Sequence, residues 1–215
     1  MSGAAPVRLA AAEHEMKAIL AGLGVRVPPS VLLRPDEPVP AALPFPFPVA
    51  AKVSSPAILH KTERGAVRLG VGDAAELARA VAELRARFPG DPILVEAMER
   101  PGVEAIVGFF RDPVFGLCVM VGVGGIFAEL YQDVAFRRLP VREADVRAML
   151  EELRGRALFE GFRGMRVSRE ALVRLVVAVS RWVLQHADRV GQMDLNPVFV
   201  REDDAVVVDA KLLAP

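Results

Sequence analysis

The segment from Val103 to Val121 constrains the fold most, because it holds two strand-like apolar runs joined by a short turn. The runs Val103 to Phe110 and Gly116 to Val121 flank Arg111-Asp112-Pro113, a sequence typical of a turn. Two such runs in succession pair as an antiparallel ribbon. Helical patterns follow or precede this ribbon, from about Asp73 to Phe88, near Ala144 to Leu153 and from about Ser168 to His186. The chain therefore predicts an α+β fold.

The remaining elements complete two α/β subdomains. A short helix is expected from Leu9 to Gly22, and an ordered or partly ordered proline-rich connection runs from Arg34 to Pro48. Further strands are expected at Val49 to Val53, Ala66 to Val71, Ile93 to Met98, Asp194 to Val200 and Ala205 to Asp209. Because Gly90 and Pro92 end the first unit, we place the subdomains at residues 1–92 and 93–215.

Composition excludes several classes of protein. Lys plus Arg and Asp plus Glu both total 27, so no basic field recruits nucleic acid. Cys118 is the single cysteine, which rules out an internal disulfide and a cysteine metal cluster. The N-terminus lacks a signal-peptide pattern, and Arg174 and Arg181 interrupt the longest apolar helix. We expect a cytoplasmic protein without a membrane span.

A lysine and a histidine lie eight residues apart after the strand at Val49 to Val53. Lys52 supplies a compact positive charge for phosphate oxygens, and the imidazole of His60 is a side chain that forms a phosphoramidate. The pair is suited to hold a phosphate and then receive it. The alternative is a surface loop in which neither residue has a chemical role.

The last two predicted strands carry a candidate magnesium site. Strand alternation puts Asp194 and Asn196 on one face, and a neighbouring strand would bring Asp209 beside them. Magnesium in nucleotide sites takes one or two protein oxygens and completes its shell with phosphates and water. The alternative is that Asp194 and Asn196 only make turn hydrogen bonds before Pro197.

Three carboxylates and a glycine cluster surround the strand at Ile93 to Met98 and the ribbon after it. Glu96, Glu99 and Glu104 occupy a hinge suited to bind adenine and ribose, or else are solvated strand ends. Gly124 and Gly125, in the run from Gly122, let backbone amides approach a phosphate, or simply form a tight turn. Arg137 and Arg138 either face phosphate or form surface salt bridges.

Together these residues resemble the ATP-grasp subunit or domain of the ADP-forming acyl-CoA synthetases, over nearly the whole chain. The resemblance rests on several ordered blocks: GVRVP after the first helix, SPAILHKTERGAV, ILVEAM, EAIVGFFRDPVFG, VMVGVGGIFAEL with DVAFRRLPV, and DLNPVFV with VVDAK. One departure is that the His60 loop ends in Arg64-Gly65-Ala66, where family members often have two glycines.

The resemblance implies an ATP-grasp fold and a phosphoryl relay using ATP or ADP and Mg²⁺. A CoA-binding, alpha-type partner subunit that uses acyl-CoA and carries its own phosphohistidine passes the phosphoryl group to His60, which passes it to ADP. The positions that match the family are Lys52 for phosphate, Glu96 and Glu104 for the nucleotide, Asn196 and Asp209 for magnesium, and Asp194 beside the phosphohistidine. We add Ser54, Lys61, Met98, Glu99, Gly124 and Gly125 to the nucleotide contacts.

Two other functions fit the same residues. One is an ATP-grasp carboxylate ligase that attacks an acyl phosphate directly, without a phosphohistidine. The other is a regulatory module that binds ATP through Lys52 and Asp209 and transfers nothing.

Overall fold

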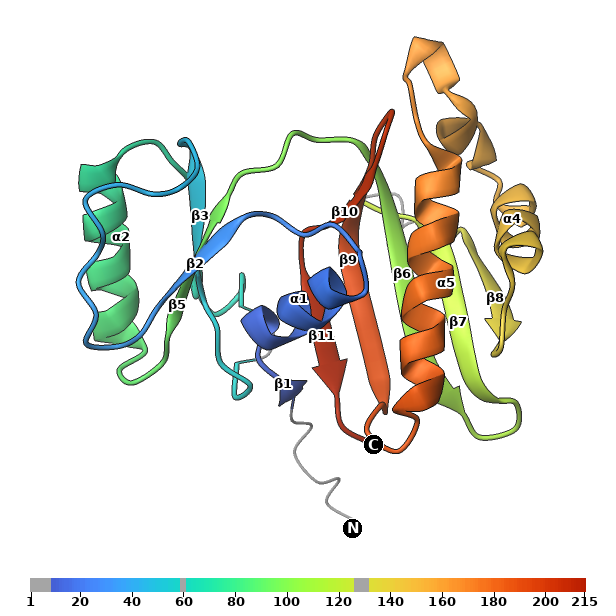
Figure 1. The fold of residues 1–215 in the computed structure, drawn as a ribbon, viewed down its shortest axis with the longest axis horizontal. Helices are drawn as coiled ribbons and strands as arrows, with labels where there is room; N and C mark the ends of the chain where they lie inside the picture. The colour runs from blue at the N-terminus through green and yellow to red at the C-terminus, as the bar shows by residue number, and fades with distance from the viewer. Residues whose placement is uncertain (1–8, 59–60, 126–131) are drawn as a thin grey trace.

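Two antiparallel sheets with helix α1 (Glu13–Gly22) between them make up the protein (Figure 1). The structure is a computed structural model that describes residues 9–58, 61–125 and 132–215. In Figure 1, α2 (Ala74–Arg87) lies on the outer side of the smaller sheet. On the larger sheet lie α4 (Glu143–Glu152) and α5 (Arg169–Gln185). The mixed α+β class is confirmed.

The smaller sheet has four strands. Its order is β2 (Ser30–Leu33), β5 (Ile93–Ala97), β3 (Val49–Val53) and β4 (Val67–Val71). All five residues of β3 are buried. Val49, Ala51 and Val53 share a core with α2 on one face, and on the other face Lys52 is buried against Glu13 and Glu96. The helix buries Leu77, Ala80, Val81 and Leu84, a spacing that lines one helical face. Asp73 caps it by accepting a hydrogen bond from the Glu76 amide at 2.8 Å, as the sequence predicts.

The larger sheet has seven strands and contains the predicted ribbon. Strands β6 (Val103–Asp112) and β7 (Gly116–Val123) pair antiparallel along their length. The full order is β1 (Leu9–Ala11), β11 (Ala210–Leu213), β9 (Gln192–Val200), β6, β7 and β8 (Val134–Arg138), with β10 (Ala205–Val207) paired to β9. The short 3₁₀ helices η1 (Arg156–Glu160) and η2 (Phe162–Gly164) precede α5. Phe109 and Phe159 are fully buried in the core between this sheet and its helices.

Four short strands do not appear among the predicted elements. β1, β2, β8 and β11 have three to five residues each, too few for a clear alternation. The helix predicted from Leu9 is wrong at its start, since residues Leu9–Ala11 pair with β11 and α1 begins at Glu13. Pairing with a distant strand decides these conformations, and local sequence does not report it.

The predicted division at residues 92 and 93 does not follow the sheets. Strand β5 pairs with both β2 and β3 and so belongs to the smaller sheet. At the other end, Met16 and Leu20 of α1 pack into the core of the larger sheet. The first and last strands of the described residues, β1 and β11, therefore belong to the larger sheet, and the segment between α1 and β6 forms the smaller one.

An ion-paired arginine fastens the β9–β10 turn to the segment after β5. The Arg201 guanidinium donates from Nε and Nη2 to the Asp204 carboxylate at 2.7 and 2.8 Å, and from Nη1 to Glu99 at 2.8 Å. Hydrogen bonding to Arg201, against a smaller effect of burial, holds the pKa of Asp204 below its ordinary value of 3.8. The turn is therefore stabilised while Asp204 is ionised.

We expect Asp204→Asn to lower the free energy of unfolding by about 1–3 kcal/mol at neutral pH, because an amide replaces a charged acceptor. Since the folded-state pKa is depressed, this stability is present above the unfolded pKa and is lost as pH falls through the folded value. Urea unfolding across acidic and neutral pH measures the difference. It should shrink toward zero in acid; a difference that grows in acid would contradict the assignment. Glu202→Gln, which removes an exposed pair with Arg166, serves as the control with little change.

Candidate functional site

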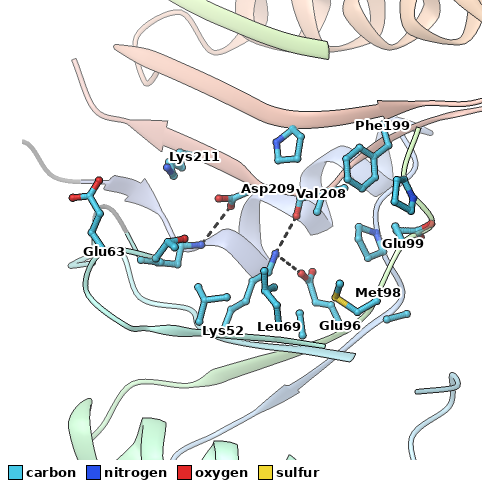
Figure 2. Close-up of a pocket in the computed structure, with 18 residues that line it drawn as sticks. Lys52, Glu63, Leu69, Glu96, Met98, Glu99, Phe199, Val208, Asp209 and Lys211 are labelled. Carbon is cyan, nitrogen blue, oxygen red and sulfur yellow. Dashed lines mark hydrogen bonds and ion pairs between the residues drawn. The ribbon is translucent and has the colours of Figure 1, made fainter. Parts of the chain in front are cut away.

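A cavity of about 440 Å³ lies between the two sheets. The smaller sheet contributes Lys52 from β3, Leu69 from β4 and Glu96 from β5. The larger sheet contributes Phe199 from β9 and Lys211 from β11, and the connection between β10 and β11 contributes Val208 and Asp209. Figure 2 shows these side chains facing one another across the cavity. The cavity therefore exists only because the two sheets meet.

Six charged residues form a cluster of which four line this cavity and two, Glu13 and Lys17, do not. We call it the lysine–carboxylate cluster: Glu13, Lys17, Lys52, Lys61, Glu96 and Asp209. Lys52 Nζ lies 2.9 Å from Glu13 Oε1 and 2.7 Å from Glu96 Oε2. It also donates to the Val208 carbonyl at 3.1 Å (Figure 2). Three ammonium groups and three carboxylates thus balance in charge, which is the condition under which buried ions are tolerated.

Burial and neighbouring charges act in opposite directions on these groups. Burial by itself would raise the pKa of Glu13, but the charges of Lys52, Lys17 and Lys61 outweigh it and hold that pKa well below its ordinary value. Burial would lower the pKa of Lys52, but Glu13, Glu96 and Asp209 raise it. At Lys17, burial and the nearby charge of Lys52 win, so its pKa is lowered. Lys52 and Glu13 are therefore charged throughout the neutral range.

Lys61 reaches the same cluster from the turn that follows the His60 position. Its Nζ pairs with Glu13 Oε2 and lies 3.5 Å from Asp209 Oδ1. Two backbone hydrogen bonds close the turn, from Gly65 to the Thr62 carbonyl and from Ala66 to the Lys61 carbonyl. Gly65 adopts φ +64°, and a Cβ there would lie 2.6 Å from the Arg87 guanidinium. The positive φ therefore favours glycine at this end of the loop.

Asp209 lies beside Asn196, as the sequence predicts, although the strand that brings it there is β11. Ala210 is opposite Leu195, and the Asn196 amide donates to the Asp209 carbonyl at 3.1 Å. Among the residues that the structure describes, the Asp209 carboxylate makes only the long contact to Lys61, and Asn196 is exposed. Two oxygen side chains with so few competing partners fit magnesium. Within residues 9–58, 61–125 and 132–215, no three His, Cys, Asp or Glu side chains converge on a metal position.

Asp194 lies on β9, the strand of Asn196, but does not line the cavity. Its carboxylate accepts two hydrogen bonds from the Gln192 amide, at 3.2 and 3.0 Å, and it is half-buried close to Gly108. The proposed role beside a phosphohistidine stays a prediction. His60 lies outside the described residues.

Met98 and Glu99 line the cavity at the end of β5, as predicted for nucleotide contacts, and Glu99 is also paired with Arg201. Ser54 is buried and does not line it. Its hydroxyl accepts a hydrogen bond from the His14 amide at 3.2 Å and lies 2.9 Å from His14 Nδ1. This partner explains the burial of Ser54 without a ligand.

Glu104, Gly124 and Gly125 line a separate cavity of about 340 Å³. The Gly124 amide donates to the Glu104 carbonyl at 2.8 Å, and a Cβ at Gly125 would meet the Glu104 carboxylate at 2.9 Å. Close packing between β6 and β7 is therefore enough to require glycine here. Their nucleotide contacts stay a prediction. For Arg137 the surface-pair alternative is confirmed, because it binds Glu152 on α4.

Two residues of the cluster, Glu13 and Lys17, are absent from the sequence prediction. Both are buried on α1, on the same face as Met16 and Leu20. A Glu–Lys pair four residues apart on the apolar face of a helix is the signal that would have found them. Charged residues there require buried partners of opposite charge.

Comparisons with known proteins agree with this geometry. Residues 4–213 match the ATP-grasp domain family. The beta subunit of an ADP-forming acetate–CoA ligase II from Pyrococcus furiosus is 37% identical over 96% of this chain and 92% of its own length. An ADP-forming acetate–CoA ligase II from Archaeoglobus fulgidus is 35% identical over 94% of this chain but only 30% of its own length.

Solved structures of acetyl-coenzyme A synthetase 1 from Candidatus Korarchaeum cryptofilum share the fold. One, in complex with coenzyme A and Ca-AMPCP, has a TM-score of 0.85 and 35% identity, covering 95% of this chain and 93% of that chain. Another contains Mg-AMPPCP and a phosphohistidine segment pointing towards the nucleotide-binding site, with a TM-score of 0.81 and 36% identity, covering 94% and 92%. The ATP-grasp fold predicted from the sequence is confirmed. The chain belongs to the ATP-grasp family, and its close relatives are the beta subunits of ADP-forming acetate–CoA ligases.

Proposed function

We propose that the chain is the nucleotide-binding subunit of an ADP-forming acyl-CoA synthetase. The overall reaction converts acyl-CoA, ADP and phosphate to a carboxylic acid, CoA and ATP, and is reversible. The observation that carries the proposal is the meeting of Lys52 and Lys61 with Asp209 in the cavity between the sheets. Relatives of this fold hold nucleotide analogues with a divalent metal ion.

The cavity has an apolar end and a charged end, which orient a nucleotide. In Figure 2, Met98, Glu99 and Phe199 lie at one side, Lys211 and Asp209 lie at the other, and Lys52 lies between. Leu69 and Met98 line the cavity although their exposed fractions are 65% and 40%. Exposed apolar side chains in a cleft are suited to cover a base. The adenine therefore takes the Met98 end, and the phosphates take the lysine end.

The lysines act by position and charge. Lys52 and Lys61 contact phosphate oxygens and hold the diphosphate of ADP toward the incoming phosphoryl group. When magnesium is bound by Asn196 and Asp209, it neutralises further phosphate charge. A β-phosphate oxygen of ADP attacks the phosphorus on His60, the P–N bond breaks, and the imidazole keeps its electron pair. Asp194 is the residue that we assign to the neighbourhood of this histidine.

A second subunit is required for the acyl chemistry. In Archaeoglobus fulgidus the matching region is 30% of a single ligase chain, whereas in Pyrococcus furiosus it is a separate beta subunit. We therefore assign the remaining functions of such a ligase to parts outside the ATP-grasp region of residues 4–213. We propose a CoA-binding alpha-type partner with its own phosphohistidine, in a hetero-oligomer located in the cytoplasm. No helix in the described parts of the chain is long and apolar enough to cross a membrane.

The test is isotope exchange between labelled ADP and unlabelled ATP, with magnesium but without acyl-CoA, acid or partner. A phosphohistidine relay predicts exchange, because the enzyme returns its phosphoryl group to any ADP that binds. A chelator should stop the exchange. The direct carboxylate ligase needs an acyl acceptor and would show none, and the regulatory module would bind ATP without exchanging it. Absence of exchange with demonstrable nucleotide binding, and with the partner added, would refute the relay.

A further inference from the structure

We infer that Glu13 is a positioning residue that holds Lys52 and Lys61 in place relative to Asp209 across the two sheets. This inference rests on the proposed function, because it assigns the lysines to the phosphates. Glu13 does not line the cavity itself. It acts through the two lysines that do.

Glu13 is attached to the larger sheet, although its partners Lys52 and Lys61 belong to the part of the chain that forms the smaller one. Its helix packs against β11, and Met16 and Leu20 of the same helix face belong to the larger core. Lys52 is on β3, and Lys61 is on the turn before β4. The carboxylate therefore joins parts of the molecule that otherwise meet across the cavity.

One carboxylate holds both lysines because each oxygen has a different partner. Oε1 lies 2.9 Å from Lys52 Nζ and 2.8 Å from Lys17 Nζ, and Oε2 pairs with Lys61 Nζ. The side chain of Glu13 is 1% exposed, so solvent does not screen these contacts. Lys61 is in turn 3.5 Å from Asp209, one of the two candidate magnesium ligands. The chain of contacts thus runs from α1 through the lysines to the phosphate end of the cavity.

This arrangement has different consequences for binding and for phosphoryl transfer. A carboxylate among the lysines opposes an incoming diphosphate by its negative charge, so removing that charge should not weaken nucleotide binding. Phosphoryl transfer, however, depends on lysines held in one geometry before the reaction. Loss of Glu13 should therefore slow the transfer and leave affinity unchanged or higher.

The experiment compares wild type with Glu13→Gln in the magnesium-dependent ADP–ATP exchange, together with ADP affinity by calorimetry. We expect the exchange rate at saturating nucleotide to fall by about tenfold or more. The dissociation constant for ADP should stay within about threefold of wild type or decrease. A parallel loss of rate and affinity would show a merely structural role and overturn the inference, as would an unchanged rate.

Two further variants separate positioning from folding. Glu15→Gln is the matched control on the same turn, because Glu15 is exposed and only accepts a hydrogen bond from the Ala12 amide, which glutamine also accepts. If Glu13→Gln fails to fold, Glu13→Asp is the substitute, because it keeps the charge but is one methylene too short to span both lysines. It should likewise lower the exchange rate without weakening the binding of ADP. If the wild-type protein shows no ADP–ATP exchange, the proposed function is refuted, and this inference is refuted with it.

Discussion

A His60→Ala variant is expected to lose the exchange between ADP and ATP and all acid-labile label from γ-labelled ATP. The relay has no other acceptor in the proposal, and removing the nucleophile of a covalent mechanism commonly costs roughly 10³-fold or more. The measurement is incubation of the purified chain with magnesium and labelled ATP, followed by acid and base treatment. Label lost in acid and kept in base identifies a phosphoramidate.

The chain provides a clear control for this result, because its sequence contains only three histidines. His186 is the C-cap of α5, stacks on Trp182 with ring centroids 4.4 Å apart, and is not among the residues that line the cavity. His186→Ala should keep both the exchange and the label. Full labelling of His60→Ala would place the phosphoryl group elsewhere and refute the relay through this residue.

Lys52→Met should abolish the exchange and also destabilise the protein by about 3–5 kcal/mol, which is typical when one partner of a buried ion pair is removed. The loss would leave Glu13 and Glu96, each 1% exposed, with one positive charge fewer between them. Denaturant unfolding measures the stability, and the exchange assay measures the activity. Arg166→Met, which removes an arginine side chain that is 77% exposed, is the stability control.

The double variant Lys52→Met with Glu13→Gln tests the origin of the destabilisation. It removes one charge of each sign and keeps the cluster balanced, so it should be more stable than Lys52→Met alone. Its exchange activity should stay absent, because the phosphate-binding ammonium is still missing. Equal stability of the single and double variants would show that lost packing, and not an unpaired carboxylate, causes the effect.

Where the local pattern was strong, the sequence predicted the elements to within a few residues. Asp73 and Ser168 are capping residues of the helices that they were predicted to start, and each side chain accepts an amide hydrogen bond of the first turn. The strand from Val49 to Val53 has the predicted bounds. These features depend on residues close together in the chain. Propensity and periodicity are therefore enough to find them.

The candidate site could also be predicted from the sequence only in part. Lys52, Lys61, Glu96, Met98, Glu99 and Asp209 were predicted, and they line one cavity. Glu104, Gly124 and Gly125 were predicted as nucleotide contacts in the same way, but they line a separate cavity. The difference is a matter of which strands become neighbours. Strand β6 pairs with β9 and β7 in the larger sheet, whereas β5 pairs with β3 in the smaller one.

The sequence by itself determined the ATP-grasp class, most of the regular elements and the lysine and carboxylate residues of the β3 and β5 strands. Only the tertiary structure decided that α1 carries Glu13 and Lys17 into the cluster. Only it showed that the chain returns at Val208 and Asp209 to complete the cavity. The physical reason is that a buried charge is stable only beside its opposite. Those opposites come from segments up to 148 residues apart, which no local pattern connects.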